Sequence, residues 1–211
     1  MPNRFHSPGD ERSSAKGRND LDSEVLQKCR QGDRDAFDLL FRRYQQSVYN
    51  FAYRLTGDPD EASDITSDSF LRVFNAIHTF RGDASFTTWL FRIVTNVFLD
   101  EKKRQRVRAH SSLDEFQNDV ESGYERQVAD PAPTPAEIVE SEERSELIQN
   151  AINQLPEYQR VMVVLFHIEG KSYEEISLIM QMPIGTVKSR LNRARLALRE
   201  MMEPQKELFR P

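Results

Sequence analysis

Hydrophobic residues in the first half of the chain recur at intervals of three and four, the spacing of amphipathic helices. A short helix is predicted over residues 21–30. A longer one follows Asp33, a suitable N-cap residue, and runs to about Thr56. Gly57 comes next and permits the left-handed conformation in which many helices end. The pattern therefore predicts two consecutive helices joined by a short turn.

The same spacing predicts two more helices before residue 109. Pro59 suits the first turn of a third helix, the first half of which is acidic. The apolar residues predicted to face inward on it are Ala62, Ile65, Val73, Phe74 and Ile77. A polar loop over residues 78–85 precedes a fourth helix, from Phe86 to about Arg106, which ends in a basic run. Residues 21–108 are thus predicted to form one all-α domain.

Helical spacing is lost over residues 109–135, which are acidic and end in a proline-rich stretch, so this segment is predicted to be a flexible linker. Beyond it, residues 136–203 are predicted to form a second domain of four helices. Its second helix should begin near Pro156 and stop at Gly170. The polar N-terminal residues 1–20 are predicted to be a disordered tail, and residues 204–211 a short C-terminal one.

The last two helices of the second domain have the pattern of a helix-turn-helix. Ser172 and Glu175 have the spacing of a capping box, so the first of these helices should start at Tyr173. Pro183 disfavours helical geometry at the residue before it, and a second helix is predicted from about Ile184.

That final helix has distinct inner and outer faces when its residues are placed about 100° apart. Its buried stripe is predicted to be Val187, Leu191, Ala194 and Leu198, with Ser189, Asn192 and Arg193 opposite and Lys188 and Arg190 at the flanks. Polar tips that contact base edges, with cations beside them that bind phosphates, suit the major groove of duplex DNA. The alternative interpretation is a basic, solvated helix at the end of a bundle.

Composition and charge limit the other functions. The net charge is −5, but residues 111–146 hold eleven acidic and two basic side chains, so the rest of the chain is net basic. Cys29 is the single cysteine, which excludes an internal disulfide, and the four histidines are scattered without catalytic or metal-site spacing. No apolar run is long enough for a membrane span, and the N-terminus lacks a signal sequence. We therefore expect no enzyme, no cofactor, no metal and no membrane insertion.

Five stretches of the chain make a family resemblance specific. They are GDRDAFDLLFRRY, DEASDITSDSFLRVF, FRGDASFTTWLFRIVTN, LPEYQRVMVVL and the pair SYEEISLIM and MPIGTVKSRLNRAR. In this order they resemble the extracytoplasmic-function (group IV) sigma factors of bacterial RNA polymerase. The resemblance implies an all-α protein in which a region 2 helical bundle is joined by a flexible acidic linker to a region 4 helix-turn-helix.

The resemblance also implies a role for each domain. The first would bind the promoter −10 element, and the acids of its third helix, Asp64 and Asp68, would contact the clamp helices of the largest polymerase subunit. Single-stranded DNA at the −10 element needs aromatic platforms and cations, which the loop around Phe80 offers. The residues assigned to this strand are Arg72, Ala76, Phe80, Arg81, Phe86, Phe91, Ile93 and Asn96. For Phe80, Phe86 and Ile93 the alternative is packing in the local core.

The second domain would bind the −35 element as duplex DNA. The residues assigned to it are Phe166, Pro183, Lys188, Ser189, Arg190, Asn192 and Arg193. Two of them depart from the family pattern. Phe166 stands where arginine is common, which puts a phosphate contact there in doubt, and Asn192 replaces a common aromatic or histidine, which affects base preference.

Two functions from different classes follow. The first is a sigma factor that directs promoter recognition, −10 strand opening and initiation, with core RNA polymerase, promoter DNA and an anti-sigma factor as partners in the cytoplasm. The second is a stand-alone helix-turn-helix regulator that binds duplex DNA. The second needs a dimer interface or a sensor domain, and the first half of the chain shows no pattern of a phosphoacceptor or ligand-binding domain.

Overall fold

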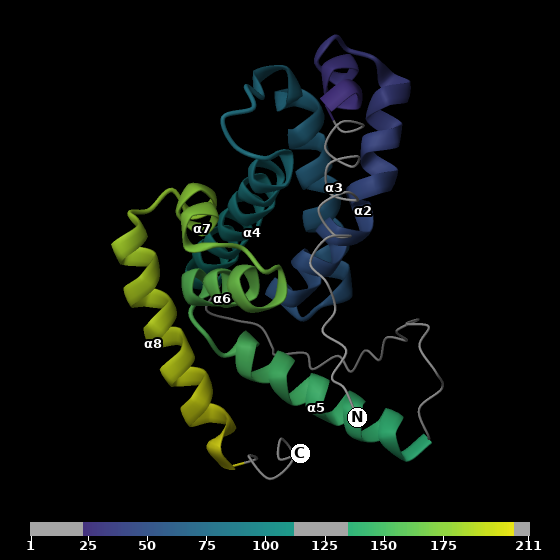
Figure 1. Cartoon of the computed structure of the whole chain (residues 1–211). Coiled ribbons are helices and arrows are strands. Elements are labelled where there is room, and N and C mark those ends of the chain that lie inside the picture. Colours follow the sequence, from purple (N-terminus) through teal and green to yellow (C-terminus); the bar gives the residue numbers. More distant parts are fainter. Residues whose placement is uncertain (1–22, 112–134, 205–211) are drawn as a thin grey trace, which may run out of the picture.

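The computed structural model describes residues 23–111 and 135–204, with side chains described over 23–108 and 144–204. Every regular element in these two ranges is helical (Figure 1). After a short helix over residues 23–30 come α2 (Arg34–Thr56), α3 (Pro59–Ala76), the 3₁₀ turn η1 (Ile77–Thr79), α4 (Phe86–Ser111), α5 (Pro135–Asn153), α6 (Glu157–Val163), the π-helical segment η2 (Val164–Ile168), α7 (Tyr173–Met180) and α8 (Ile184–Met202). The expected all-α fold is confirmed. The predicted tails and most of the predicted linker lie outside the described residues.

The first helical domain is built on α2, which packs along α3 and also contacts α4. Val48, Phe51 and Leu55 on α2 are fully buried, as are Val94 and Phe98 on α4. Edge-to-face aromatic contacts join the helices, with Phe41 against Phe70 and Phe51 against Phe91. The apolar residues whose spacing predicted these helices therefore also form the core of the domain.

The second helical domain places α8 against α6, α7 and α5 (Figure 1). Val161 and Leu165 form its centre with Ile176 from α7 and Leu191 from α8, and all four are fully buried. The predicted inner stripe of α8 is buried at Val187, Leu191 and Ala194, whereas Leu198 is half-buried.

Several predicted helix ends are confirmed. The Asp33 side chain accepts a hydrogen bond from the Ala36 amide (3.1 Å), and α2 ends at Thr56, where Gly57 has φ +71°. Only glycine adopts this conformation without strain, so the chain turns there into α3. Asp58 caps α3 by accepting from the Glu61 amide (2.8 Å).

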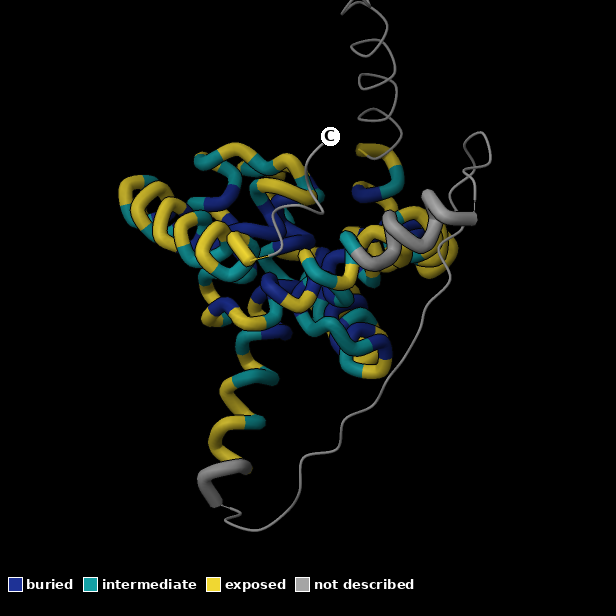
Figure 2. Tube along the Cα trace, turned by 90° about the horizontal axis from the view of Figure 1, so that it is seen from below, coloured by how far each residue is buried: buried dark blue, intermediate teal, exposed yellow. Residues whose placement is uncertain are grey.

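The two domains pack directly against each other. Helix α7 lies on α4, α5 and η2 contact α2, and α6 contacts both α2 and α4. The buried residues of both domains form one continuous hydrophobic cluster, and Figure 2 shows buried segments of both meeting in the middle of the molecule. The sequence pattern predicted the two domains but not this shared core.

Arg160 joins the two domains at the centre of this contact. Its Nη1 donates to the Leu55 carbonyl at the end of α2 (2.7 Å), and its Nη2 donates to the carbonyls of Asn153 and Leu155 before α6. The guanidinium also lies 6.0 Å from the centre of the Phe98 ring. Burial lowers the pKa of Arg160, although the negative charges of Glu157 and Glu61 act to raise it. The guanidinium thus provides hydrogen bonds to carbonyl groups on both sides of the contact between the domains.

A second set of contacts brings α5 onto the end of α2. Arg54 Nη1 donates to Gln149 Oε1 (3.2 Å), and Gln149 Nε2 donates back to the Arg54 carbonyl (3.1 Å) and to Asn153 Oδ1 (3.0 Å). The Asn153 side chain comes so close to Gly57 that a Cβ there would lie 2.1 Å from its Nδ2. Gly57 thus ends α2 and also makes room for α5.

Three local predictions differ from the structure. Phe74 is 46% exposed rather than buried, because its ring packs edge-to-face on Phe37 at the rim of the α2–α3 contact. Helix α4 continues to Ser111, beyond the predicted end near Arg106. The helix predicted from Pro156 to Gly170 changes after Val163 into the π-helical segment η2, in which the Glu169 amide donates to the Val164 carbonyl (3.0 Å).

Candidate nucleic-acid interface

The helix-turn-helix is formed by α7 and α8, and its first helix begins as predicted. Ser172 Oγ accepts from the Glu175 amide (3.1 Å), and Glu175 Oε2 accepts from the Ser172 amide (2.9 Å), so the capping box is complete. Burial alone would raise the pKa of Glu175, but hydrogen bonds from Ser172 and Thr88 and the charge of Lys171 outweigh it and lower that pKa. The start of α7 is thereby fixed.

The turn that aims α8 is held by local hydrogen bonds. Gln181 adopts a left-handed conformation (φ +51°), and Ser177 Oγ donates to the Met182 carbonyl (2.5 Å). The Pro183 carbonyl then accepts from the amides of Thr186 and Val187 and begins α8. Pro183 itself is exposed at the tip of this turn, where the resemblance assigns a DNA contact.

The outer face of α8 is exposed where the sequence predicted it. Ser189, Asn192 and Arg193 are all exposed, and so is Lys188 at the flank. Arg190 differs, because it is half-buried, its guanidinium lies 5.9 Å from the Tyr158 ring centre, and its Nη1 contacts the Met182 sulfur (3.5 Å). The face therefore presents a hydroxyl, an amide and a guanidinium in adjacent positions, a combination that can hydrogen-bond base edges.

Aromatic rings lie behind one flank of α8. Phe166 on η2 and Tyr173 on α7 face each other with ring centres 5.0 Å apart, and both are half-buried. The Arg195 guanidinium lies 4.6 Å from the Phe166 ring centre, and Lys188 Nζ lies 5.5 Å from that of Tyr173. Phe166 is thus covered by a cation from α8 and is not itself the outermost group at this position.

The acidic residues of α3 divide into two sets. Asp64 and Asp68 are exposed, and neither forms an ion pair with another described residue. Glu61 instead accepts from Lys102 Nζ (2.9 Å) and Gln105 Nε2 (2.5 Å) on α4 and so belongs to the fold. The two acids assigned to a polymerase contact are accessible.

The aromatic residues assigned to the −10 strand form a cluster at the start of α4. Phe80 is half-buried, and its ring lies 5.8 Å from Phe86 and 5.4 Å from Trp89, centre to centre. Phe86 is buried beneath it, and Phe91 is buried one turn further along α4. Lys171 from the second domain covers the Phe91 ring at 5.2 Å. Phe80 is therefore the outermost aromatic side chain of this cluster.

The remaining −10 candidates lie on the same part of the first domain with different accessibility. Asn96 and Arg81 are exposed, while Ala76 and Ile93 are half-buried. Arg72 Nη1 donates to Asp100 Oδ2 (2.9 Å) in an ion pair between α3 and α4, which leaves it less available than a free cation.

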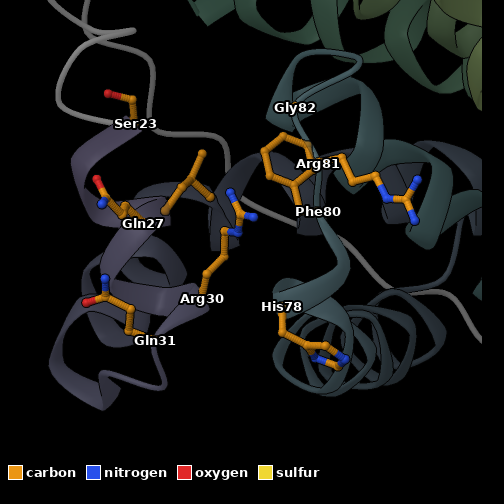
Figure 3. Close-up of a pocket in the computed structure, with 9 residues that line it drawn as sticks. Ser23, Gln27, Arg30, Gln31, His78, Phe80, Arg81 and Gly82 are labelled. Atoms are coloured by element: carbon orange, nitrogen blue, oxygen red, sulfur yellow. The ribbon is translucent and has the colours of Figure 1, made fainter.

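A cavity of about 590 Å³ opens beside Phe80, between residues 23–30 and the loop after η1. Figure 3 shows the Phe80 ring and the Arg30 guanidinium pointing into this space, whereas Arg81 points away from the short helix. Gln27 and Gln31 also line it, although Figure 3 shows their amide groups on the side of the short helix away from Phe80. The sequence analysis did not select Gln27, Arg30 or Gln31, although the polar face of the amphipathic segment indicated them.

The comparisons with known proteins agree with this arrangement. Residues 40–108 match the family described as sigma-70 region 2, and residues 145–198 match sigma-70 region 4. The chain is 33% identical to the RNA polymerase sigma-H factor of Pseudomonas aeruginosa over 87% of this chain and 94% of that protein. It is also 33% identical to the ECF RNA polymerase sigma-E factor of Escherichia coli, over 87% and 95%. The chain belongs to the extracytoplasmic-function (ECF) sigma factors.

Two solved structures share the fold of this sigma factor. The sigma factor RpoE of Bartonella quintana, crystallised with the anti-sigma factor NepR, has a TM-score of 0.62 at 24% identity, over 79% of this chain and 96% of that one. CnrH in complex with the cytosolic domain of CnrY has a TM-score of 0.58 at 20% identity, over 85% and 96%. At these identities, the likeness concerns the fold.

In the described part of the sigma factor, no group of three or more histidine, cysteine, aspartate or glutamate side chains is placed to hold a metal ion. In the same residues, no helix combines the length and apolar character needed to cross a membrane. Cys29 is buried, and burial, reinforced by the charge of Asp33, raises the pKa of its thiol.

Proposed function

We propose that this sigma factor divides promoter recognition among three surfaces: α3 binds core polymerase, the Phe80 region binds the displaced −10 strand, and α8 reads the −35 element. As an RNA polymerase sigma factor it directs transcription initiation. The observation that carries the residue-level proposal is the outer face of α8, where Ser189, Asn192 and Arg193 are all exposed on a helix that begins at the hydrogen-bonded turn around Pro183.

The role of α8 follows from its chemistry. An arginine guanidinium donates in a fork that matches the acceptors of guanine, and an asparagine amide matches adenine. Arg193 and Asn192 are adjacent and exposed, while the buried stripe of α8 holds the helix on the rest of the domain. The helix can therefore enter the major groove without rearrangement of its own fold.

The role of α3 rests on its exposed acids. Asp64 and Asp68 are one helical turn apart and face solvent. An acidic helix face attracts a basic partner surface and speeds the encounter with it. The clamp helices of the polymerase are the partner that the family resemblance implies, and these two acids supply complementary charge.

The role of the Phe80 region rests on one accessible ring beside a polar cavity. A displaced base can stack on an aromatic side chain, and a base taken out of the duplex needs hydrogen-bonding partners. Phe80 provides the ring, and the Arg30 guanidinium, which points into the same cavity, provides hydrogen-bond donors. The buried Phe86 then supports Phe80 from below, and contact of DNA with Phe91 requires the Lys171 side chain to move away.

An anti-sigma factor is the further partner we infer, by analogy with the Bartonella quintana sigma factor, which was crystallised with the anti-sigma factor NepR. Because its partners are the polymerase and chromosomal DNA, we place the sigma factor in the cytoplasm. Capture of the tagged protein from native cells should recover a protein that inhibits its transcription. Recovery of core polymerase with no inhibitory protein would argue against this partner.

Run-off transcription with purified core polymerase tests the proposed function. Templates from upstream of native operons should give transcripts of defined length only when the sigma factor is added. The same templates with the −35 or −10 element replaced should give none. Tight, specific duplex binding by the isolated chain without such initiation would instead support a stand-alone regulator.

A further inference from the structure

We propose that Arg195 binds a DNA phosphate at the edge of the −35 interface, held in place by Phe166 and His167. This inference rests on the proposed function of α8 and adds a residue to it. Arginine at the position of Phe166 is common in the family, and its replacement left a phosphate contact in doubt. The structure places another guanidinium at the same spot, because Arg195 reaches from α8 across the Phe166 ring at 4.6 Å.

The π-helical turn of η2 creates the support for Arg195. This wider turn carries Phe166 and His167 in succession, with their rings 5.0 Å apart in an edge-to-face contact. Arg195 Nε donates to His167 Nε2 (3.0 Å), so the histidine is neutral with its proton on Nδ1. Burial and the charge of Arg195 lower the pKa of His167, which keeps it an acceptor at neutral pH.

Stacking and this single hydrogen bond leave the end of the guanidinium available. In the described part of the chain, neither terminal nitrogen of Arg195 forms a hydrogen bond, and no carboxylate forms an ion pair with it. The region of α8 from Lys188 to Arg199 contains no acid. A free arginine loses considerable side-chain entropy when it binds a ligand, and a guanidinium that is already stacked loses less.

The position of Arg195 on α8 points to a phosphate rather than a base. Arg195 and Lys188 are seven residues apart, so they lie within about 20° of each other around the helix and about 10 Å apart along it. Both flank the outer face of Ser189, Asn192 and Arg193, and both lie over a ring of the Phe166–Tyr173 pair. Two cations in line beside a base-reading face suit the sugar-phosphate wall of the groove.

The test is the salt dependence of promoter binding by holoenzyme assembled from core polymerase and the full chain. Arg195→Gln removes the charge and keeps an amide that can still donate to His167, so we expect it to fold. A phosphate contact contributes about 0.9 to the slope of log affinity against log salt concentration. The variant should therefore lower that slope by about one and weaken binding by about tenfold, equally for native and −35-substituted promoter duplexes.

Three further variants distinguish a phosphate contact of Arg195 from a general effect of lost charge and from base recognition by α8. Arg195→Lys keeps the charge and should retain the slope, while Arg42→Gln removes one exposed charge from α2 and should leave it unchanged. Arg193→Ala should weaken the native promoter more than the substituted one. An unchanged slope in Arg195→Gln, or a loss explained by a lower melting temperature, would overturn the phosphate role. If Arg193→Ala also showed no preference between promoters, the proposed function of α8 would fail as well.

Discussion

At the scale of single residues, Arg160 joins the two domains, and the sequence analysis did not select it. It satisfies the carbonyls of Leu55, Asn153 and Leu155, which lie on opposite sides of the contact between the domains. Nothing in the local pattern around Arg160 indicates these partners, because Leu55 is 105 positions away in the chain. Contacts of this range depend on how the two domains meet and not on helical spacing.

Replacement of Arg160 should therefore be costly. Arg160→Met keeps much of the apolar stem but leaves buried carbonyl groups without donors, which we expect to lower the free energy of unfolding by about 3 kcal/mol. Arg104→Met is the matched control, because Arg104 is exposed and, among the described residues, pairs only with Glu101 (3.2 Å), and it should change stability by less than about 0.5 kcal/mol. Denaturant titration of both variants gives the comparison, and equal small losses would show that Arg160 does not join the domains.

His167 gives a prediction about pH. Its pKa in the folded protein is lowered, so the unfolded state takes up the proton first as the pH falls below about 6.5. The stability contributed by the neutral histidine is therefore present above that pH and is lost as the pH falls further. His167→Gln keeps an acceptor for Arg195 and should flatten the dependence of the denaturation midpoint between pH 7.5 and 5.5. Identical profiles for the two proteins would contradict the assignment.

At the scale of elements, local sequence rules predicted the ends of helices better than their internal geometry and the burial of their side chains. The caps at Asp33 and Ser172 and the end of α2 before Gly57 depend on residues within one turn, and all three are confirmed. The π-helical turn of η2 and the exposure of Phe74 were not predicted. Both depend on packing against other helices, which the periodicity of a single segment does not contain.

In the candidate site, too, features determined by a single helix were predicted, and features that depend on contacts between elements were not. The outward position of Ser189, Asn192 and Arg193 followed from the helical wheel, because one well-formed helix determines it. The support of Arg195 by the Phe166 ring involves two elements and could be found only in the structure. Burial of Phe91 under Lys171 involves two domains, and it changes which aromatic side chain is accessible.

Substitution of two glycines at helix ends can distinguish the cost of local backbone strain from the cost of disturbed packing between the domains. Gly32 and Gly57 both have positive φ (+87° and +71°), so alanine at either should cost about 1 kcal/mol in backbone strain. A Cβ at Gly32 meets nothing within 4 Å, but at Gly57 it meets the Asn153 side chain. Gly57→Ala should thus be less stable than Gly32→Ala by a further 1 to 3 kcal/mol or so, measured by denaturant titration. Equal losses would mean that α5 does not pack on Gly57 in solution.

At the scale of the whole molecule, the two domains share a core in this arrangement, while the surfaces assigned to the polymerase and to the −35 element remain accessible. Asp64 and Asp68 on α3 and the outer face of α8 are exposed together. The contact of α7 with α4 covers Phe91 and joins Lys171 and Glu175 to the start of α4, through Thr87 (3.5 Å) and Thr88 (3.4 Å). The proposed function therefore assigns polymerase binding and reading of the −35 element to separate surfaces, which single substitutions can distinguish.

Competition for core polymerase, measured together with −35 duplex recognition, tests this separation most directly. Arg193→Ala should compete for core as well as the unaltered protein and lose −35 recognition, because its change lies on α8. Asp64→Arg should fail to compete for core and keep the −35 contacts of α8, while Asp38→Arg, on the exposed face of α2, should retain both. If Arg193→Ala and Asp64→Arg competed for core equally well, the assignment of the two surfaces would be contradicted.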